Sequence, residues 1–141
     1  MIYFVDTNIF LRLIVNDNQK KFEDCLDFMK LIKTRKIDAV TCSLVLSEIE
    51  WVLRSTYNAS KEEIIDQLEY IDNLPIISIN TYWDQTAIDI YRNHKVKLVD
   101  AQITSIPQIK KSEWTIVSYD RDFDKLKVRR KEPAEIIRKK Y

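Results

Sequence analysis

The stretch IYFV, residues 2–5, is a continuously apolar, β-prone run that ends at a carboxylate, Asp6. A strand without alternation of apolar and polar residues is covered on both faces, which is typical of parallel sheets flanked by helices. Asp6 is therefore expected at the carboxyl end of a buried parallel strand. In open parallel sheets, ligands bind in the crevice beyond this end of the strands.

Helix-like and strand-like stretches alternate along the rest of the chain. The pattern predicts strands over 38–42, 76–79 and 114–118. In the first half of the chain it predicts a helix over 20–33, a helix from a capping Ser43 to about Tyr57, and a helix after a Ser60–Glu63 capping box. In the second half it predicts a helix containing Trp83 and Ala87, a short helix from Val99 to Ile106 stopped by Pro107, and a basic tail ending in a helix. This alternation indicates one α/β domain over residues 1–141, with a mostly parallel central sheet.

The composition excludes several kinds of site. Glycine is absent from all 141 residues, so neither the dinucleotide-binding fingerprint nor a phosphate-binding P-loop can form. His94 is the single histidine, and with Cys25 and Cys42 it does not have the spacing of zinc ligands. Any metal bound by this chain is therefore expected to have oxygen ligands.

Charge and hydropathy give further expectations. The chain has two cysteines and no recognisable secretory or transit signal, so a cytoplasmic location is expected. No apolar run approaches the ~20 residues that a membrane span needs. The net charge is only +1, so a nucleic-acid partner would have to be bound by a local basic patch.

Four acids are candidates for chemistry, and each has a plainer alternative. Asp6 and Asp120 follow predicted strands, but aspartates also cap helices and favour turns. Glu48 lies on the apolar stripe of its helix, where it either pairs with an arginine or lysine or shares a cation with other carboxylates. Asp100 lies in a first helical turn, where acids are favoured anyway.

If these carboxylates converge, they repel one another and their pKa values rise unless a cation neutralises them. Mg²⁺ and Mn²⁺ both suit carboxylate oxygens, and such ions activate water and stabilise the leaving oxygen in phosphodiester cleavage. The constellation therefore suggests a metal-dependent nuclease.

Four segments carry a family resemblance. FVDTNIFLRL, SLVLSEIEWVLR, LVDAQI and IVSYDRDF resemble, in order and near the same spacing, the four acidic motifs of PIN domains, most closely those of VapC-type toxin ribonucleases. The resemblance spans nearly the whole chain. It implies a three-layer α/β/α fold, Mg²⁺- or Mn²⁺-dependent cleavage of RNA, a homodimer, and inhibition by a small antitoxin protein.

The resemblance also implies roles for individual residues. It matches Asp6, Glu48, Asp100 and Asp120 to the catalytic metal-binding acids, Asp122 to an accessory ligand, and Thr7, Asn8 and Ser118 to supporting polar residues. Asp122 stays an alternative to Asp120 as the fourth acid, although Asp120 aligns better with the family position. Thr7 and Asn8 are equally well explained as capping residues of the next helix.

A basic segment follows the fourth acid. Lys127, Arg129, Arg130 and Lys131 are candidate contacts for the RNA backbone. The alternative is that this charge run is a solvated face.

Two other functions compete with a nuclease. A phosphatase of the haloacid dehalogenase type also begins with an aspartate at a strand end, but it usually has a second aspartate where this chain has Asn8, so the nuclease is favoured. A non-catalytic α/β binding module, in which the acids only cap helices, is the other alternative. The sequence does not identify the RNA, the cleavage site, the metal or the number of ions.

Overall fold

The computed structural model describes residues 1–80 and 84–139, and within them five strands form one parallel sheet in the order β3-β2-β1-β4-β5. The strands are β1 (Ile2–Val5), β2 (Asp38–Cys42), β3 (Ile77–Ile79), β4 (Trp114–Val117) and β5 (Arg130–Lys131). The expectation of a mostly parallel central sheet is confirmed.

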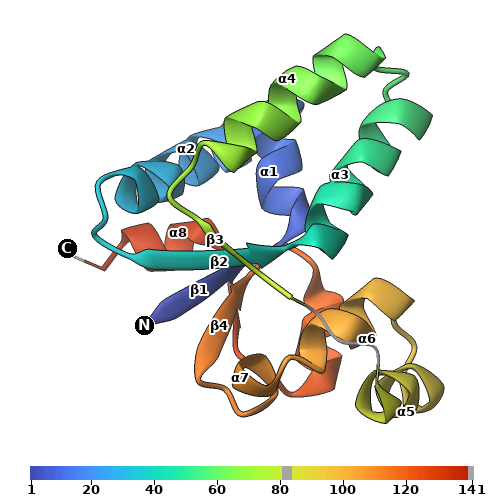
Figure 1. Ribbon diagram of the computed structural model, residues 1–141. Helices are drawn as coiled ribbons and strands as arrows, with labels where there is room; N and C mark the ends of the chain where they lie inside the picture. The colour runs from blue at the N-terminus through green and yellow to red at the C-terminus, as the bar shows by residue number, and fades with distance from the viewer. Residues whose placement is uncertain (81–83, 140–141) are drawn as a thin grey trace.

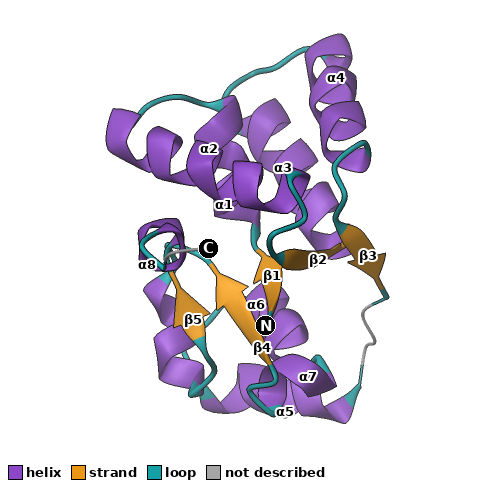
Figure 2. Ribbon diagram, turned by 90° about the vertical axis from the view of Figure 1, so that its left-hand side faces the viewer, coloured by secondary structure: helices purple, strands orange, loops and turns teal. Residues whose placement is uncertain are grey.

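Helices cover both faces of this sheet, which confirms the three-layer α/β/α arrangement (Figures 1 and 2). The layer on one face contains α1 (Thr7–Ile14), α2 (Gln19–Lys33), α3 (Ser43–Ser55) and α4 (Lys61–Asp72). The layer on the other face contains α5 (Gln85–Asn93), α6 (Leu98–Thr104) and α7 (Pro107–Lys110). A 3₁₀ helix, η1 (Arg121–Leu126), follows β4, and α8 (Pro133–Ile137) packs against α2.

Strand β1 lies at the centre of the sheet and of the core. Tyr3, Phe4 and Val5 are all buried, as their unbroken apolar run predicts. Phe4 is in register with Val40 of β2 on one side and with Ile116 of β4 on the other. Because β1 has a partner strand on each side and helices on each face, polar side chains can be accommodated only at its ends.

The order in which strands are added to the sheet reverses at β1. From β1 the chain moves outward to β2 and β3, and it then returns to the opposite side of β1 to form β4 and β5. The two adjacent strands end together, because the amide of Asp6 donates to the carbonyl of Val117 at 3.1 Å. This is the topological switch point, where side chains that follow β1 and β4 meet at one crevice.

Two predicted boundaries around α3 were wrong. Ser43 is the first helical residue rather than the cap, and Cys42 occupies the N-cap position without a side-chain capping bond. The helix also ends at Ser55 instead of Tyr57. Asn58 has φ 51°, so the chain turns into the left-handed region and cannot continue the helix.

The remaining predictions were mostly confirmed. The Ser60–Glu63 capping box is present, with both reciprocal bonds at the start of α4. The short helix predicted from Val99 to Ile106 is α6, but it ends at Thr104 and Pro107 does not stop it. Pro107 instead begins α7, because proline suits the first helical position. Trp83, which the sequence places in the helix that contains Ala87, lies outside the described residues.

Because the chain has no glycine, other residues adopt positive φ angles where helices end. Arg35, Asn58, Ser112 and Lys127 all have positive φ, and each follows a helix end at which other proteins commonly place glycine. Each such residue costs about 1 kcal/mol relative to glycine.

In the part of the chain that the structure describes, no helix is both long enough and apolar enough to cross a membrane.

Candidate metal centre

Asp6 lies directly after β1, with its side chain 5% exposed. Its backbone occupies the N-cap position of α1, but the side chain makes no capping bond. Instead, its Oδ2 accepts a hydrogen bond from Ser118 Oγ at 2.7 Å and a longer one from Asn8 Nδ2 at 3.4 Å. The geometry therefore does not support helix capping as the reason for this aspartate.

Ser118 and Asn8 tie the ends of β1 and β4 together. The Ser118 hydroxyl donates to Asp6 and accepts from Asn8 Nδ2 and from the Asp120 amide, both at 2.9 Å. The Tyr119 amide donates to Asn8 Oδ1 at 3.1 Å. Asn8 therefore bonds across the sheet edge and does not cap α1, and the network fixes the position of the Asp6 carboxylate.

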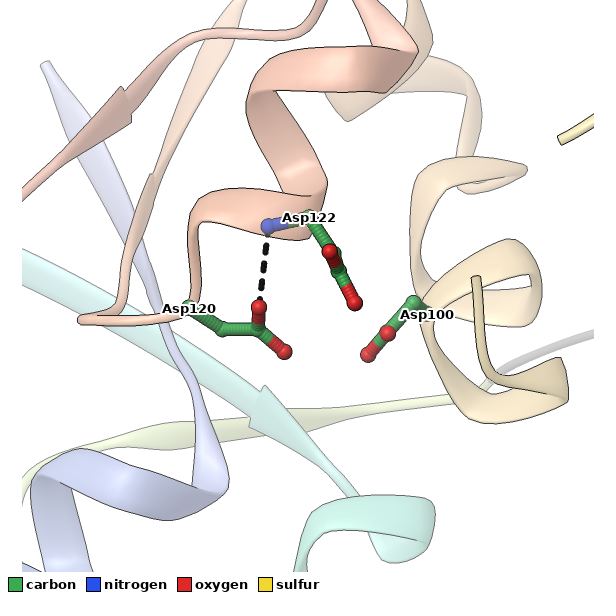
Figure 3. A group of neighbouring side chains, drawn as sticks. All are labelled: Asp100, Asp120 and Asp122. Carbon is green, nitrogen blue, oxygen red and sulfur yellow. Dashed lines mark hydrogen bonds between the residues drawn. The ribbon is translucent and has the colours of Figure 1, made fainter. Parts of the chain in front are cut away.

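A second group of acids, drawn in Figure 3, includes Asp120, whose amide donates to the Ser118 hydroxyl of this network. Asp100, Asp120 and Asp122 each offer a carboxylate oxygen, and these atoms lie within 4.8 Å of one another. Asp100 comes from α6, whereas Asp120 and Asp122 come from the segment after β4. Asp100 thus converges with two acids from a different segment of the chain.

The three acids differ in how far their oxygens are already bonded. Asp120 caps η1, because its Oδ1 accepts from the Asp122 amide at 2.9 Å. Asp122 pairs with Lys125 at 2.7 Å. Asp100 is 2% exposed, and its Oδ2 has no hydrogen-bond partner among the described residues. A buried carboxylate oxygen without a partner is costly, and an ion or a water molecule beside it would remove that cost.

Glu48 reaches the same region from α3. Its side chain is 21% exposed, and its Oε1 lies 3.8 Å from Lys97 Nζ. Its charge also acts on Asp6, where it raises the pKa of that carboxyl. The lysine pairing expected for Glu48 is therefore present, and a cation that Glu48 shares with other carboxylates stays a prediction.

The carboxyls of Asp6 and Asp100 have raised pKa values. Burial raises the pKa of Asp6 to about 6, against the opposing effect of the Ser118 hydrogen bond. Burial also raises the pKa of Asp100 to about 7, and the charges of Asp120 and Asp6 add to this while Lys97 opposes it. Acids in this condition are stabilised in their charged form by a cation placed among them.

Lys97 is a charged residue of the site that the sequence analysis missed. Partial burial acts to lower its pKa, but Glu48, Asp100, Asp120 and Asp6 outweigh this and raise it. The available signal was its position as N-cap of α6, where a positive charge opposes the helix dipole. A lysine at this position is better explained by the acids that surround it.

The donor set fits a hard divalent cation. The charged donors at this edge of the sheet are carboxylates, which Mg²⁺ and Mn²⁺ accept, and no histidine or cysteine joins the Asp100–Asp120–Asp122 group. The unpartnered Asp100 oxygen and the raised pKa values of Asp6 and Asp100 both indicate a place for a positive charge among these carboxylates. Thr7 follows Asp6 in the sequence, and its buried Oγ1 also lacks a hydrogen-bond partner among the described residues.

The predicted basic segment has mixed surroundings. Lys127 and Arg129 are exposed, and Lys131 is half-buried in β5. Arg130 is 11% exposed and forms two hydrogen bonds to Asp124, at 2.9 and 3.2 Å, and a third to the Ser118 carbonyl at 2.9 Å. This geometry favours a structural role for Arg130 over a contact with RNA.

Comparison with known proteins agrees with the fold. The PIN domain family matches residues 3–129, so the chain belongs to the PIN domain family. A comparison with curated protein sequences gave no match.

Three solved structures share the fold. VapBC2 from Rickettsia felis, bound to a DNA fragment from their promoter, is 17% identical over 94% of this chain and 98% of that chain, with a TM-score of 0.66. VapC20 from Mycobacterium tuberculosis, described as a sarcin-ricin loop cleaving toxin, is 16% identical over 89% and 95%, with a TM-score of 0.69. PAE2754 from Pyrobaculum aerophilum is 14% identical over 97% and 93%, with a TM-score of 0.61.

Proposed function

We propose that this protein is a metal-dependent endoribonuclease and the toxin of a toxin–antitoxin pair. The observation that carries the proposal is the convergence of Asp100, Asp120 and Asp122, acids of the third and fourth motifs, with one buried carboxylate oxygen left without a partner among the described residues. The charges of Asp6 and Glu48, acids of the first two motifs, act on Lys97 beside this group. Membership of the PIN family supports it, and neither the phosphatase nor the binding-module alternative is favoured by that membership.

In this proposal, Asp6, Glu48 and Asp100 hold Mg²⁺ or Mn²⁺ directly or through waters. Asp120 completes that site or holds a second, weaker one, with Asp122 beside it as an accessory ligand. When bound, the ion supplies a Lewis acid that activates water and neutralises charge on the phosphate.

The chain's own residues orient the acids for hydrolysis. Ser118 and Asn8 fix the Asp6 carboxylate, and the Ser118 hydroxyl also positions the backbone of Asp120. The hydrolysis forms a bond between water oxygen and phosphorus and breaks the bond from phosphorus to the 3′ oxygen, which takes up a proton. The products are a 5′-phosphate and a 3′-hydroxyl.

The partners follow from the family resemblance. The substrate is RNA, and Lys127, Arg129 and Lys131 are proposed contacts to its backbone. A small antitoxin protein is proposed as the inhibitor, a second copy of this chain as the dimer partner, and the cytoplasm as the location. A tagged chain expressed in its own cells is expected to recover a small protein that blocks cleavage, and recovery of none would count against the toxin but not against the nuclease.

Cleavage of labelled total cellular RNA tests the nuclease. Wild-type protein with Mg²⁺ or Mn²⁺ is expected to give discrete products, and EDTA is expected to abolish them. Asp6→Asn should reduce the rate by about 100-fold or more, because the charge is lost from the metal site, while the fold persists because the amide oxygen can still accept from Ser118. Asp72→Asn, at an exposed position on α4, is the matched control and should retain full activity.

Two results would contradict the proposal. An Asp6→Asn variant with full activity would remove Asp6 from the chemistry. Cleavage that persists undiminished in EDTA would remove the metal. Failure of the wild-type protein both to cleave RNA and to bind either ion in a calorimetric titration would favour the non-catalytic binding module.

A further inference from the structure

An open groove adjoins the metal centre on the side of α5 and α6. Its volume is about 690 Å³, and it is lined by Tyr91, His94, Lys95, Val96, Lys97 and Asp122. The first five residues form the end of α5 and the connection to α6, while the last belongs to the acidic cluster. The groove therefore begins at the acids and leads away from them.

The lining combines cations with an exposed aromatic ring. Lys95 and Lys97 are exposed, and Tyr91 is 52% exposed although it is a large ring at a helix end. Nδ1 of His94 lies 3.0 Å from the carbonyl oxygen of Ile90, where it donates, and this contact orients the imidazole ring. Positive side chains that follow a backbone, together with a ring on which a base stacks, are the features that bind single-stranded nucleic acid.

Lys97 connects the groove to the acids. Its ammonium lies 3.8 Å from Glu48 Oε1 and also lines the groove. Its charge acts on Asp100, Asp120 and Asp6, so it stands between the proposed metal position and the groove. A lysine in this place can neutralise a phosphate that lies next to a metal ion.

We infer that this groove binds the single-stranded RNA segment on one side of the cleaved phosphate, with a base stacked on Tyr91 and the backbone neutralised by Lys95 and Lys97. The inference rests on the proposed nuclease function. It adds a substrate subsite to that function and requires the bound segment to be unpaired, because a base in a duplex cannot stack on a side chain.

The first test compares groove variants with matched controls on the RNA segment that the wild-type protein cleaves, supplied as a labelled single strand with Mn²⁺. Tyr91→Ala and Lys95→Gln should each raise KM by about tenfold while kcat changes by less than about twofold. Lys95→Gln should also reduce the salt dependence of RNA binding by about one ion. A calorimetric Mn²⁺ titration should be unchanged in both variants.

The controls match the groove residues in type and exposure. Tyr57→Ala removes a ring that is 46% exposed and lies just after α3. Lys36→Gln removes an exposed lysine just before β2, at the edge of the sheet opposite to the acids. Neither substitution should change KM. Annealing the RNA to its complement should weaken binding to the wild-type protein and abolish the difference between wild type and Tyr91→Ala.

A second variant tests Lys97 with two opposed readouts. Lys97→Met should tighten Mn²⁺ binding by about three- to tenfold, because a positive charge is removed from beside the ion. The same substitution should raise KM for RNA, because a phosphate contact is lost. A purely structural role would not move the two quantities in opposite directions.

The outcomes separate this inference from the function on which it rests. If the wild-type protein cleaves RNA with Mn²⁺ but Tyr91→Ala and Lys95→Gln have the KM of wild type, the groove assignment is overturned and the nuclease stands. Equal effects in Tyr57→Ala and Lys36→Gln would overturn it as well, and unchanged Mn²⁺ affinity in Lys97→Met would overturn the part given to Lys97. If the wild-type protein neither binds Mn²⁺ nor cleaves RNA, the nuclease fails and the groove assignment fails with it.

Discussion

At the scale of single residues, the Ser118 hydroxyl is the group on which the acidic site most depends. It is fully buried and takes part in three hydrogen bonds, one donated to Asp6 and two accepted from Asn8 and the Asp120 amide. A hydroxyl has one donor and two acceptor positions, so its capacity is fully used. One side chain therefore orients an acid that follows β1 and the backbone of an acid that follows β4.

Ser118→Ala should weaken both the fold and the metal site. Loss of these bonds should lower the free energy of unfolding by about 1 to 3 kcal/mol. Loss of the donor to Asp6 should raise the pKa of that carboxyl further, so Mn²⁺ affinity should fall more at pH 6 than at pH 8. Urea unfolding and calorimetric titration at both pH values measure the two effects.

Ser105→Ala is the control for that substitution. Ser105 is also buried, but its hydroxyl donates to the Gln102 carbonyl at 2.7 Å and contacts none of the acids. It should affect stability alone. A Ser118→Ala variant with wild-type Mn²⁺ affinity at pH 6 would show that the hydroxyl does not support the Asp6 carboxylate.

At the scale of elements, the short strand β5 is held in place by an arginine. Arg130 binds both oxygens of Asp124 in η1 and also the carbonyl of Ser118 after β4. The Arg130 side chain is 11% exposed and that of Asp124 is 52% exposed, so only the arginine side of this interaction is shielded from solvent. The guanidinium thus joins β5, η1 and the segment that carries Ser118.

Arg130→Gln should therefore lower the free energy of unfolding by about 1 to 3 kcal/mol, since a paired charge-assisted interaction is lost. Arg129→Gln, at the neighbouring exposed position, should change it by less than about 0.5 kcal/mol. Chemical denaturation of both variants gives the comparison. Equal stability of the two variants, with RNA binding reduced only by Arg130→Gln, would instead assign Arg130 to the RNA.

The sequence predicted the elements that have a strong local pattern. The unbroken apolar run of β1, the capping box of α4 and the strand before Ser118 all leave signals in a few adjacent residues. By contrast, β5 has two residues and cannot show a period, and η1 lies in a segment whose acids are explained equally well by turns.

The residues of the site were predictable to a similar extent. The four motif acids lie shortly after recognisable strands or within recognisable helices, so their places could be expected from the resemblance. Lys97 could not be assigned from its neighbours, because its partner Glu48 is on a different helix and far away in sequence. Arg130 was likewise grouped with the exposed basic residues beside it, since its burial results from packing between elements.

At the scale of the whole molecule, the buried acids couple stability to pH. The pKa values of Asp6 and Asp100 are about 6 and 7 in the folded chain, above their ordinary value of 3.8. The folded chain therefore binds these protons more tightly than the unfolded chain does. Their contribution to stability is fully present below about pH 4 and is lost as the pH rises through 6 and 7.

Without metal, this contribution to the free energy of unfolding should fall by on the order of 7 kcal/mol between pH 4 and pH 8. Mn²⁺ binds the ionised carboxylates, so it should raise the melting temperature more at pH 8 than at pH 5. Thermal unfolding at the two pH values, with and without Mn²⁺, measures this, and Asp100→Asn should reduce the difference. An equal Mn²⁺ effect at both pH values would contradict the coupling.

The central claim is that acids from all four motifs bind a divalent ion at the carboxyl edge of the sheet. Crystals grown with Mn²⁺, measured at a wavelength where manganese scatters anomalously, test it most directly. An anomalous peak is expected among the carboxylates of Asp6, Asp100 and Asp120, with Glu48 facing it. Manganese found only at unrelated surface positions, with these carboxylates free of it, would contradict the account.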